Sequence, residues 1–184
     1  MQKYLNIFFF VIVLLFLSCS TNNSPISPID EFGEGTDYDI YSLVLNQVTS
    51  KISADTILLS DSTRYWDISN CYESIKSSND DIDEEILDNY QSLNNESFKL
   101  LNIPNLNKEC IILSEKSDWK KRYPKAYGIY FLSRVGFNSD STRALVYIED
   151  YSAPLVATGS LFLLEREENW IIKKTIFDWI CGRF

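Results

Sequence analysis

The chain has 184 residues, of which 45% are hydrophobic and 14% aromatic, so it suits one packed domain after a targeting segment is removed. Its 26 acidic and 17 basic side chains give a net charge of −9, which argues against nucleic acid as a partner because phosphate binding requires clustered lysine and arginine. It contains no histidine, which excludes Ser-His-Asp triads and imidazole-based zinc sites.

An uninterrupted apolar run, IFFFVIVLLFL, covers residues 7–17. A membrane-spanning helix needs about 20 apolar residues, so this run fits the hydrophobic region of a cleavable signal better. Leu17-Ser18-Cys19 follows the pattern of a lipobox, although Phe16 stands where leucine is usual. The segment therefore resembles a bacterial lipoprotein signal peptide, which implies cleavage before Cys19 and acylation of its thiol. An uncleaved signal anchor is the alternative.

The residues that follow Cys19 are rich in Ser, Asn, Pro and Gly, and residues 19–36 are predicted to form a flexible tether. Surface-exported lipoproteins of Bacteroidota often carry acids directly after the cysteine, and residues 20–23 have none. The resemblance thus implies a protein anchored by lipid, at the outer membrane and facing the periplasm. Residues 1–18 are the predicted signal peptide, and residues 37–184 a single domain.

Apolar residues at helical spacing predict three helices, over residues 38–52, 81–93 and 114–119. Thr36 or Asp37 is the predicted N-cap of the first helix. Residues 62–79 are polar and irregular apart from Trp66, and no helix is expected there.

The strand-like segments fall into two groups. Two short buried strands are predicted over residues 56–60 and 109–113. Four longer runs with short connections predict an antiparallel meander, over residues 128–137, 143–150, 155–165 and 170–181. Alternation in the first run places Ile129, Phe131, Val135 and Phe137 on one face. The predicted fold class is α+β, with N-terminal helices followed by a four-stranded antiparallel meander, and a cystatin-like or NTF2-like cone as the specific expectation.

A motif runs through the last third of the chain: Tyr123-Pro124, LSRVGFN at residues 132–138, ALVY at 144–147, LLE at 163–165, and Trp170. It resembles a family of uncharacterised exported bacterial proteins over about residues 109–181. The resemblance implies export but carries no activity, so it assigns no catalytic residue.

Two side chains are candidates for ligand binding. Arg134 is predicted to lie opposite Phe131, among apolar residues, where it either pairs with Glu149 or Glu165 or binds an anionic ligand in bidentate fashion. The structural pairing is favoured, because such pairs are common in sheets. Trp66 lies in a polar stretch and either joins the core or contacts a partner.

Three Asp-Ser or Asp-Thr triplets resemble the acceptor sequence for O-glycosylation in Bacteroidota, with Thr56, Ser62 and Ser141 as the acceptors. The same residue types are common in turns, and the turn interpretation is favoured.

No metal site and no cofactor are expected. The acidic run at residues 79–85 departs from an EF-hand, since Ile86 occupies the glycine position, and acids are favoured at the start of a helix in any case. Residues 117–120 match the S-x-x-K motif of penicillin-binding proteins, but its partner motifs are missing from the sequence. Lipidation of Cys19 leaves Cys71, Cys110 and Cys181, so at most one intramolecular disulfide can form.

These features predict a lipid-anchored periplasmic binding or accessory protein, whose partner is a protein or glycan of the envelope. A carboxylate-dependent envelope hydrolase and a purely structural envelope lipoprotein are the alternatives. An enzymatic role stays open but is disfavoured, and no catalytic residue is assigned. A deep pocket with two acids of shifted pKa would favour the hydrolase, whereas a domain without a pocket would favour the structural role.

Overall fold

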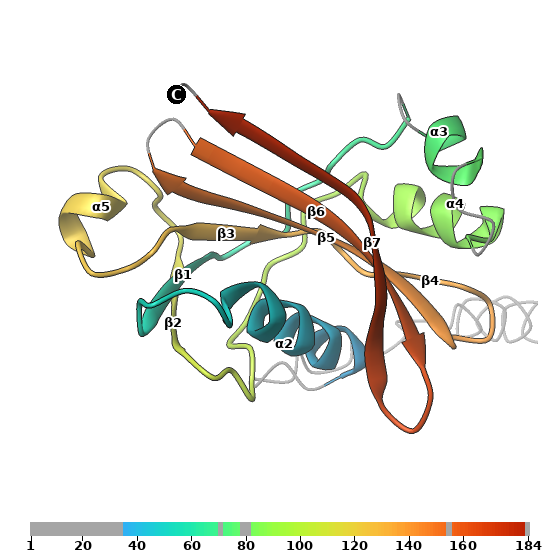
Figure 1. Cartoon of the computed structure of the whole chain (residues 1–184), viewed down its shortest axis with the longest axis horizontal. Helices are drawn as coiled ribbons and strands as arrows, with labels where there is room; N and C mark the ends of the chain where they lie inside the picture. Colours follow the sequence, from blue (N-terminus) through green and yellow to red (C-terminus); the bar gives the residue numbers. More distant parts are fainter. Residues whose placement is uncertain (1–34, 70–71, 78–81, 154–155, 183–184) are drawn as a thin grey trace, which may run out of the picture. The chain divides into compact units, whose positions relative to one another are not determined.

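A mixed sheet of seven strands runs through residues 35–69, 72–77, 82–153 and 156–182, the part of the chain that this computed structural model describes. Six strands form a continuous order, β2-β1-β3-β5-β6-β7, and β4 pairs with β5 alone (Figure 1). Their bounds are Thr56–Ser60 (β1), Glu109–Leu113 (β2), Ile129–Leu132 (β3), Gly136–Phe137 (β4), Arg143–Ala153 (β5), Val156–Arg166 (β6) and Trp170–Gly182 (β7).

Four helices accompany the sheet in this part of the chain: α2 (Thr36–Thr49), α3 (Tyr72–Ser77), α4 (Glu84–Leu93) and α5 (Trp119–Arg122). The domain therefore has the α+β composition that the sequence predicts. All of these elements belong to the unit that spans Glu31–Phe184. No helix among the described residues is long and apolar enough to cross a membrane.

The predicted four-stranded meander is wrong as a description of the whole sheet. The strands β3, β5, β6 and β7 are antiparallel neighbours, as expected, but β1 pairs in parallel with both β2 and β3. Helices α3 and α4 lie in the connection from β1 to β2, and α5 lies in the connection from β2 to β3. Such long connections allow parallel pairing, and a short apolar run does not reveal its partner strand.

The predicted strand over residues 128–137 is interrupted at residues 133–135 and becomes β3 and β4. Ser133 is fully buried at this break. Its hydroxyl accepts a hydrogen bond from the backbone of Tyr147 (2.9 Å), and its carbonyl accepts one from the hydroxyl of Tyr41 (3.0 Å). The Ser133 hydroxyl thus takes the place of a backbone carbonyl as the acceptor for the N–H of Tyr147.

The break also ends the predicted alternation of side chains. Ile129 and Phe131 pack on the α5 side of the sheet, whereas Val135 and Phe137 pack on the α2 side. The expectation that these four side chains share a face was therefore wrong, because the irregular residues between β3 and β4 shift the period.

Helix boundaries differ from the prediction in several places, since α2 ends at Thr49 rather than at residue 52 and α4 begins at Glu84 rather than at residue 81. The N-cap of α2 is Gly35, whose φ of 147° favours glycine, and Thr36 and Asp37 are already helical. Helix α3 was not predicted. Helix α5 begins at Trp119, where the predicted helix ends.

Three buried clusters hold the domain together. The largest lies between α2 and one face of the sheet, and it includes Tyr41, Leu45 and Val146. The second lies on the opposite face under α3 and α4, with Ile86, Tyr90 and Leu161. The third joins α5 to β1, β2 and β3. Figure 1 shows α5 and the α3–α4 pair at different ends of the sheet. Because every cluster is internal to this unit, we expect it to fold on its own.

Candidate functional site

A cavity of about 450 Å³ lies on the α2 face of the sheet, beyond the end of the helix. We call it the α2-side cavity. Its floor is formed by β3, β5 and β6, and its walls by the chain that leaves α2 and by the residues before β3. The lining residues are Val48, Lys51, Ile52, Ser53, Tyr127, Tyr130, Ile148, Asp150, Thr158 and Ser160. Its volume lies within the usual range for small-molecule sites.

Sheet register brings the polar floor residues together. Asp150 of β5 pairs with Tyr130 of β3 on one side and with Thr158 of β6 on the other. Ser160 lies in the next row, opposite Ile148. Since α2 ends at Thr49, this end of the sheet face is left without a covering helix, and the row faces the cavity.

Asp150 is the central group of this floor. Its Oδ2 accepts a hydrogen bond from the Thr158 hydroxyl, whereas its Oδ1 is buried and has no hydrogen-bond partner among the described residues. Burial, and to a lesser extent the charge of Glu149, raise the pKa of Asp150, and the hydrogen bonds from Thr158 and Ser152 offset part of that rise. A buried carboxyl oxygen without a partner is costly, especially when the group is charged. The carboxyl is therefore poised to take up a proton or to accept a donor from a ligand.

The surroundings of Asp150 supply hydroxyl groups and aromatic rings. Burial also raises the pKa of Tyr130, so its hydroxyl stays a neutral donor. Tyr127 is exposed at the edge of the cavity, and Ser160 adds a hydroxyl to the floor. Among the described lining residues Asp150 is the only carboxyl and Lys51 the only cation. Glycoside hydrolysis by a carboxylate pair would require a second acid facing the same cavity.

The neighbouring acid, Glu149, lies on the opposite face. It is 7% exposed, and its Oε2 lies 3.4 Å from Nη1 of Arg64. The same Arg64 nitrogen donates to the hydroxyl of Tyr151 (3.0 Å), and the guanidinium lies over the ring of Phe131, 5.2 Å from its centroid. These contacts pair Glu149 with Arg64 and stack the guanidinium on the ring of Phe131.

Arg134 does not pair with Glu149 or Glu165, which corrects the expected structural pairing. It lies in the break between β3 and β4, where its guanidinium packs over the ring of Phe98 (5.4 Å to the centroid) and donates to the carbonyl of Leu93 (3.4 Å). The break changes the direction of its side chain relative to a regular strand. Arg134 is not among the residues that line the α2-side cavity.

Trp66 joins the aromatic packing on the face opposite α2. Its ring stacks on Tyr147 (4.7 Å between centroids) and on Phe177 (5.0 Å). It is half-buried, and Trp179 lies nearby, donating to the hydroxyl of Tyr147 (2.9 Å). Its contacts are those of an aromatic cluster, and a partner role for Trp66 stays a prediction.

The three predicted glycosylation acceptors have different surroundings. The hydroxyl of Thr56 donates to Glu109 (3.0 Å), and Ser62 forms an isolated bridge with Lys99. Ser141 is exposed, with a φ of 55°, in the loop between β4 and β5. Ser141 is therefore the most accessible of the three.

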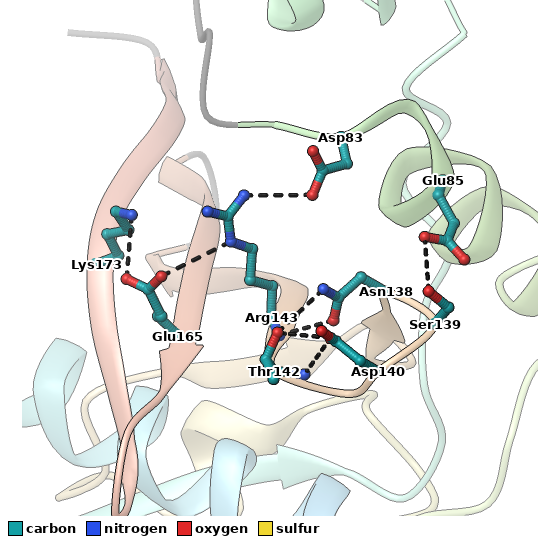
Figure 2. A network of polar contacts seen from close by, with 9 residues as sticks. All are labelled: Asp83, Glu85, Asn138, Ser139, Asp140, Thr142, Arg143, Glu165 and Lys173. Atoms are coloured by element: carbon teal, nitrogen blue, oxygen red, sulfur yellow. Dashed lines mark hydrogen bonds and ion pairs between the residues drawn. The ribbon is translucent and has the colours of Figure 1, made fainter.

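A polar network holds the loop that carries Ser141 (Figure 2). Thr142 donates through its backbone (3.1 Å) and its hydroxyl (2.6 Å) to the carboxylate of Asp140. Arg143 pairs with Asp83, just before α4 (3.3 Å), and with Glu165 of β6 (3.7 Å). The Asp-Ser-Thr sequence thus forms the turn that its residue types favour.

The cysteines that the structure describes lie far apart. Cys110 is in β2 and Cys181 is in β7, which are the two edges of the six-strand order. Neighbouring strands are about 4.8 Å apart, so about 24 Å separates the edges, far beyond the 7 Å limit for a disulfide. Burial raises the pKa of Cys110 to about 11. Cys19 and Cys71 lie outside the described residues, as do the signal peptide and the tether up to residue 34, whereas Gly35 and Thr36 lie at the start of α2.

Asp150 was not singled out from the sequence, although a signal was present. Side chains at alternate positions of β5, from Ala144 through Val146 to Ile148, face the α2 cluster, and Asp150 occupies the next inward position. A carboxyl at a core-facing position is a departure from binary patterning. Among the described residues, no group of three or more His, Cys, Asp or Glu side chains is placed to hold a metal ion.

Comparisons of the chain with known protein families, with curated proteins and with solved structures found no significant match. The case for a function therefore rests on the geometry of the domain.

Proposed function

We propose that this protein is a lipid-anchored binding protein of the bacterial envelope, facing the periplasm, whose α2-side cavity takes a hydroxyl-rich ligand such as an envelope glycan. The observation that carries the proposal is the unpartnered Oδ1 of Asp150 in the floor of a 450 Å³ cavity. Completing the hydrogen bonds of a buried carboxyl favours a ligand that brings donors.

A sugar ring matches the chemistry of the lining. Its hydroxyls can donate to Asp150 and accept from Tyr130 and Ser160, and its apolar face can pack on an aromatic ring. The presence of one carboxyl rather than two in this cavity supports binding over hydrolysis. A protein partner would instead donate hydrogen bonds to Asp150 from its backbone or side-chain amides.

The binding test uses the domain, Glu31–Phe184, labelled for NMR and titrated with disaccharides of N-acetylhexosamines and with neutral hexoses. The proposal expects shift changes that concentrate at residues 148–160 and 127–130. Asp150→Asn is expected to weaken binding about tenfold, the loss of one charged hydrogen bond. Glu73→Gln, at an exposed acid on α3 on the opposite face of the sheet, is the control and is expected to leave binding unchanged.

Shift changes that map instead to Trp66, or binding that Asp150→Asn leaves intact, would overturn the assignment of the cavity. The cystatin-like or NTF2-like cone stays part of this proposal, supported by the packing of α2 on one face of the sheet.

The anchor has its own test. Cells that express the full chain are fed labelled palmitate, and the mature amino terminus is read by mass spectrometry. An acylated Cys19 and the absence of residues 1–18 are expected, and Cys19→Ser should abolish both. A native chain with an unmodified Cys19 would remove the envelope assignment without affecting the cavity.

A further inference from the structure

The segment that contains α5 reverses the charge balance of the chain. Residues 115–125 carry five basic and two acidic side chains, whereas the rest of the chain carries 12 basic and 24 acidic ones. The cations are Lys116, Lys120, Lys121, Arg122 and Lys125. A strongly acidic protein thus has one compact basic region.

Packing of α5 directs these cations to the solvent. Trp119 and Tyr123 pack against the buried cluster of Leu58, Leu113 and Ile129, and so fix the helix on the end of the sheet. Lys120, Lys121 and Lys125 are exposed as a result. Among the described residues neither Lys120 nor Lys121 forms an ion pair, although Lys120 lies 5.9 Å from the centre of the Trp119 ring.

An apolar hollow of about 310 Å³ borders the same segment. Ile111, Tyr123, Pro124 and Ala126 line it, together with the stem of Lys125. Tyr127, which follows directly, is 40% exposed. Lysines around aromatic rings and a shallow apolar surface are the combination that anchors proteins at a membrane interface. We call residues 116–127 the α5 surface.

We propose that the α5 surface docks on an anionic lipid membrane. The acidic groups elsewhere on the domain do not prevent this contact, because the Debye length at physiological ionic strength is about 8 Å, and charges further from the membrane are screened. The basic side chains of the α5 surface lie at the contact and attract the anionic headgroups. The apolar hollow and Tyr127 add an interfacial contact.

This inference does not rest on the glycan-binding proposal or on the Cys19 anchor, although Tyr127 borders both the α2-side cavity and the α5 surface. It also goes beyond tethering, since a lipid chain holds the domain near a membrane without choosing which face of the domain touches it. Docking through α5 would fix that orientation.

Sedimentation with vesicles tests the proposal on the domain, Glu31–Phe184, which lacks the signal and the lipid. The vesicles contain either phosphatidylcholine alone or phosphatidylcholine with one third phosphatidylglycerol. The domain is expected to sediment with the anionic vesicles and to stay in the supernatant when the vesicles are neutral. At 0.5 M NaCl it is expected to be released from the anionic vesicles. Each lysine at such a surface contributes about fivefold to binding, so Lys120→Glu/Lys121→Glu is expected to weaken it at least about 20-fold.

Lys76→Glu/Lys99→Glu is the matched control, because it makes the same change in net charge outside both the α5 surface and the α2-side cavity. It is expected to retain most of the binding, and thermal unfolding checks that both variants are folded. Equal losses in the two variants, or the absence of binding to anionic vesicles at low salt, would overturn the proposal. So would binding to a soluble polyanion such as heparin without binding to vesicles.

Discussion

Glu149 and Asp150 are neighbours in β5, and their side chains lie on opposite faces of the sheet. Glu149 is buried beside Arg64, which pairs with it and lies over the ring of Phe131. Asp150 is hydrogen-bonded to Thr158 and Ser152, but its Oδ1 is buried without a partner among the described residues. The carboxylate of Glu149 thus has a charged partner, whereas one oxygen of the Asp150 carboxyl has none among the described residues.

The difference follows from what covers each face. Helices α3, α4 and α5 and the segment that carries Arg64 pack over the face of Glu149, whereas α2 ends before it reaches Asp150. A buried carboxylate with a partner is a structural element, whereas one without a partner is a candidate site for a ligand. The comparison predicts opposite responses to mutation on the two faces.

The largest effect is expected at Gly136, where the sheet packs directly against the backbone of α4 on the Glu149 face. A Cβ on Gly136 would lie 2.6 Å from Cα of Tyr90 in α4, a backbone atom that cannot move without the helix. Gly136→Val is therefore expected to cost roughly 3 kcal/mol in the free energy of unfolding. Urea unfolding of the domain measures it.

Gly136→Ala provides the graded comparison, since its Cβ alone creates the contact, and it should cause most of the same loss. Unchanged stability in both variants would show that α4 can move away from β4, and that this face is not tightly packed.

The second effect concerns the ion pair itself. Arg64→Met leaves Glu149 buried without its partner and is expected to destabilise the domain by about 1–3 kcal/mol. Adding Glu149→Leu should restore much of the loss, because no charge then stays buried. Removing the exposed pair of Lys76 and Glu84 is the control, with a much smaller expected cost than Arg64→Met because solvent screens an exposed pair. A double variant as unstable as Arg64→Met would contradict the role given to Glu149.

The sequence alone predicts the elements of the sheet better than their partners. Period-2 runs separated by turn residues locate β5, β6 and β7 to within three residues at every end. Residues 56–60 and 109–113 were also expected as strands, but their parallel pairing depends on contacts between distant segments. The hydrophobic pattern within each strand does not indicate which strand it pairs with, or in which direction.

The site was harder to predict because it depends on the end of a helix and on an irregular break. The buried Ser133 interrupts the strand and turns Arg134 away from Glu149, and neither effect is visible in an alternating pattern. Asp150 is visible as a polar residue at an inward position. Whether such a residue is covered or open follows only from where α2 ends.

The third prediction uses the pH dependence of Asp150. Burial raises its pKa above the ordinary value of 3.8, so over the range just above 3.8 the native state holds a proton that the unfolded state has lost. The contribution of this group to the free energy of unfolding is fully present below 3.8 and is lost as pH rises through the native-state pKa. Asp150→Asn lacks this loss, so its stability relative to the unmodified domain is expected to increase with pH.

Urea unfolding at several pH values between 3.5 and 7.5 measures the difference, with Asp178→Asn as the control for removing one exposed acid. A difference between Asp150→Asn and the unmodified domain that stays constant over this range would show that Asp150 is as well solvated as a surface carboxyl.

The smallest effect on stability is expected from reduction of the cysteines, which take no part in the contacts that distinguish the two faces. Cys110 and Cys181 are on opposite edges of the sheet and cannot be joined, so neither face depends on a disulfide between them. A reductant is expected to change the melting temperature by less than about 1 °C.

In the native domain a thiol reagent should modify the exposed Cys181 quickly, and Cys110, whose pKa is raised to about 11, only after unfolding. Cys181→Ser removes the fast phase and serves as the control. A large fall in melting temperature with reductant would instead require a bond that involves Cys71, and it would make that bond, rather than the packing on the two faces, the main source of stability.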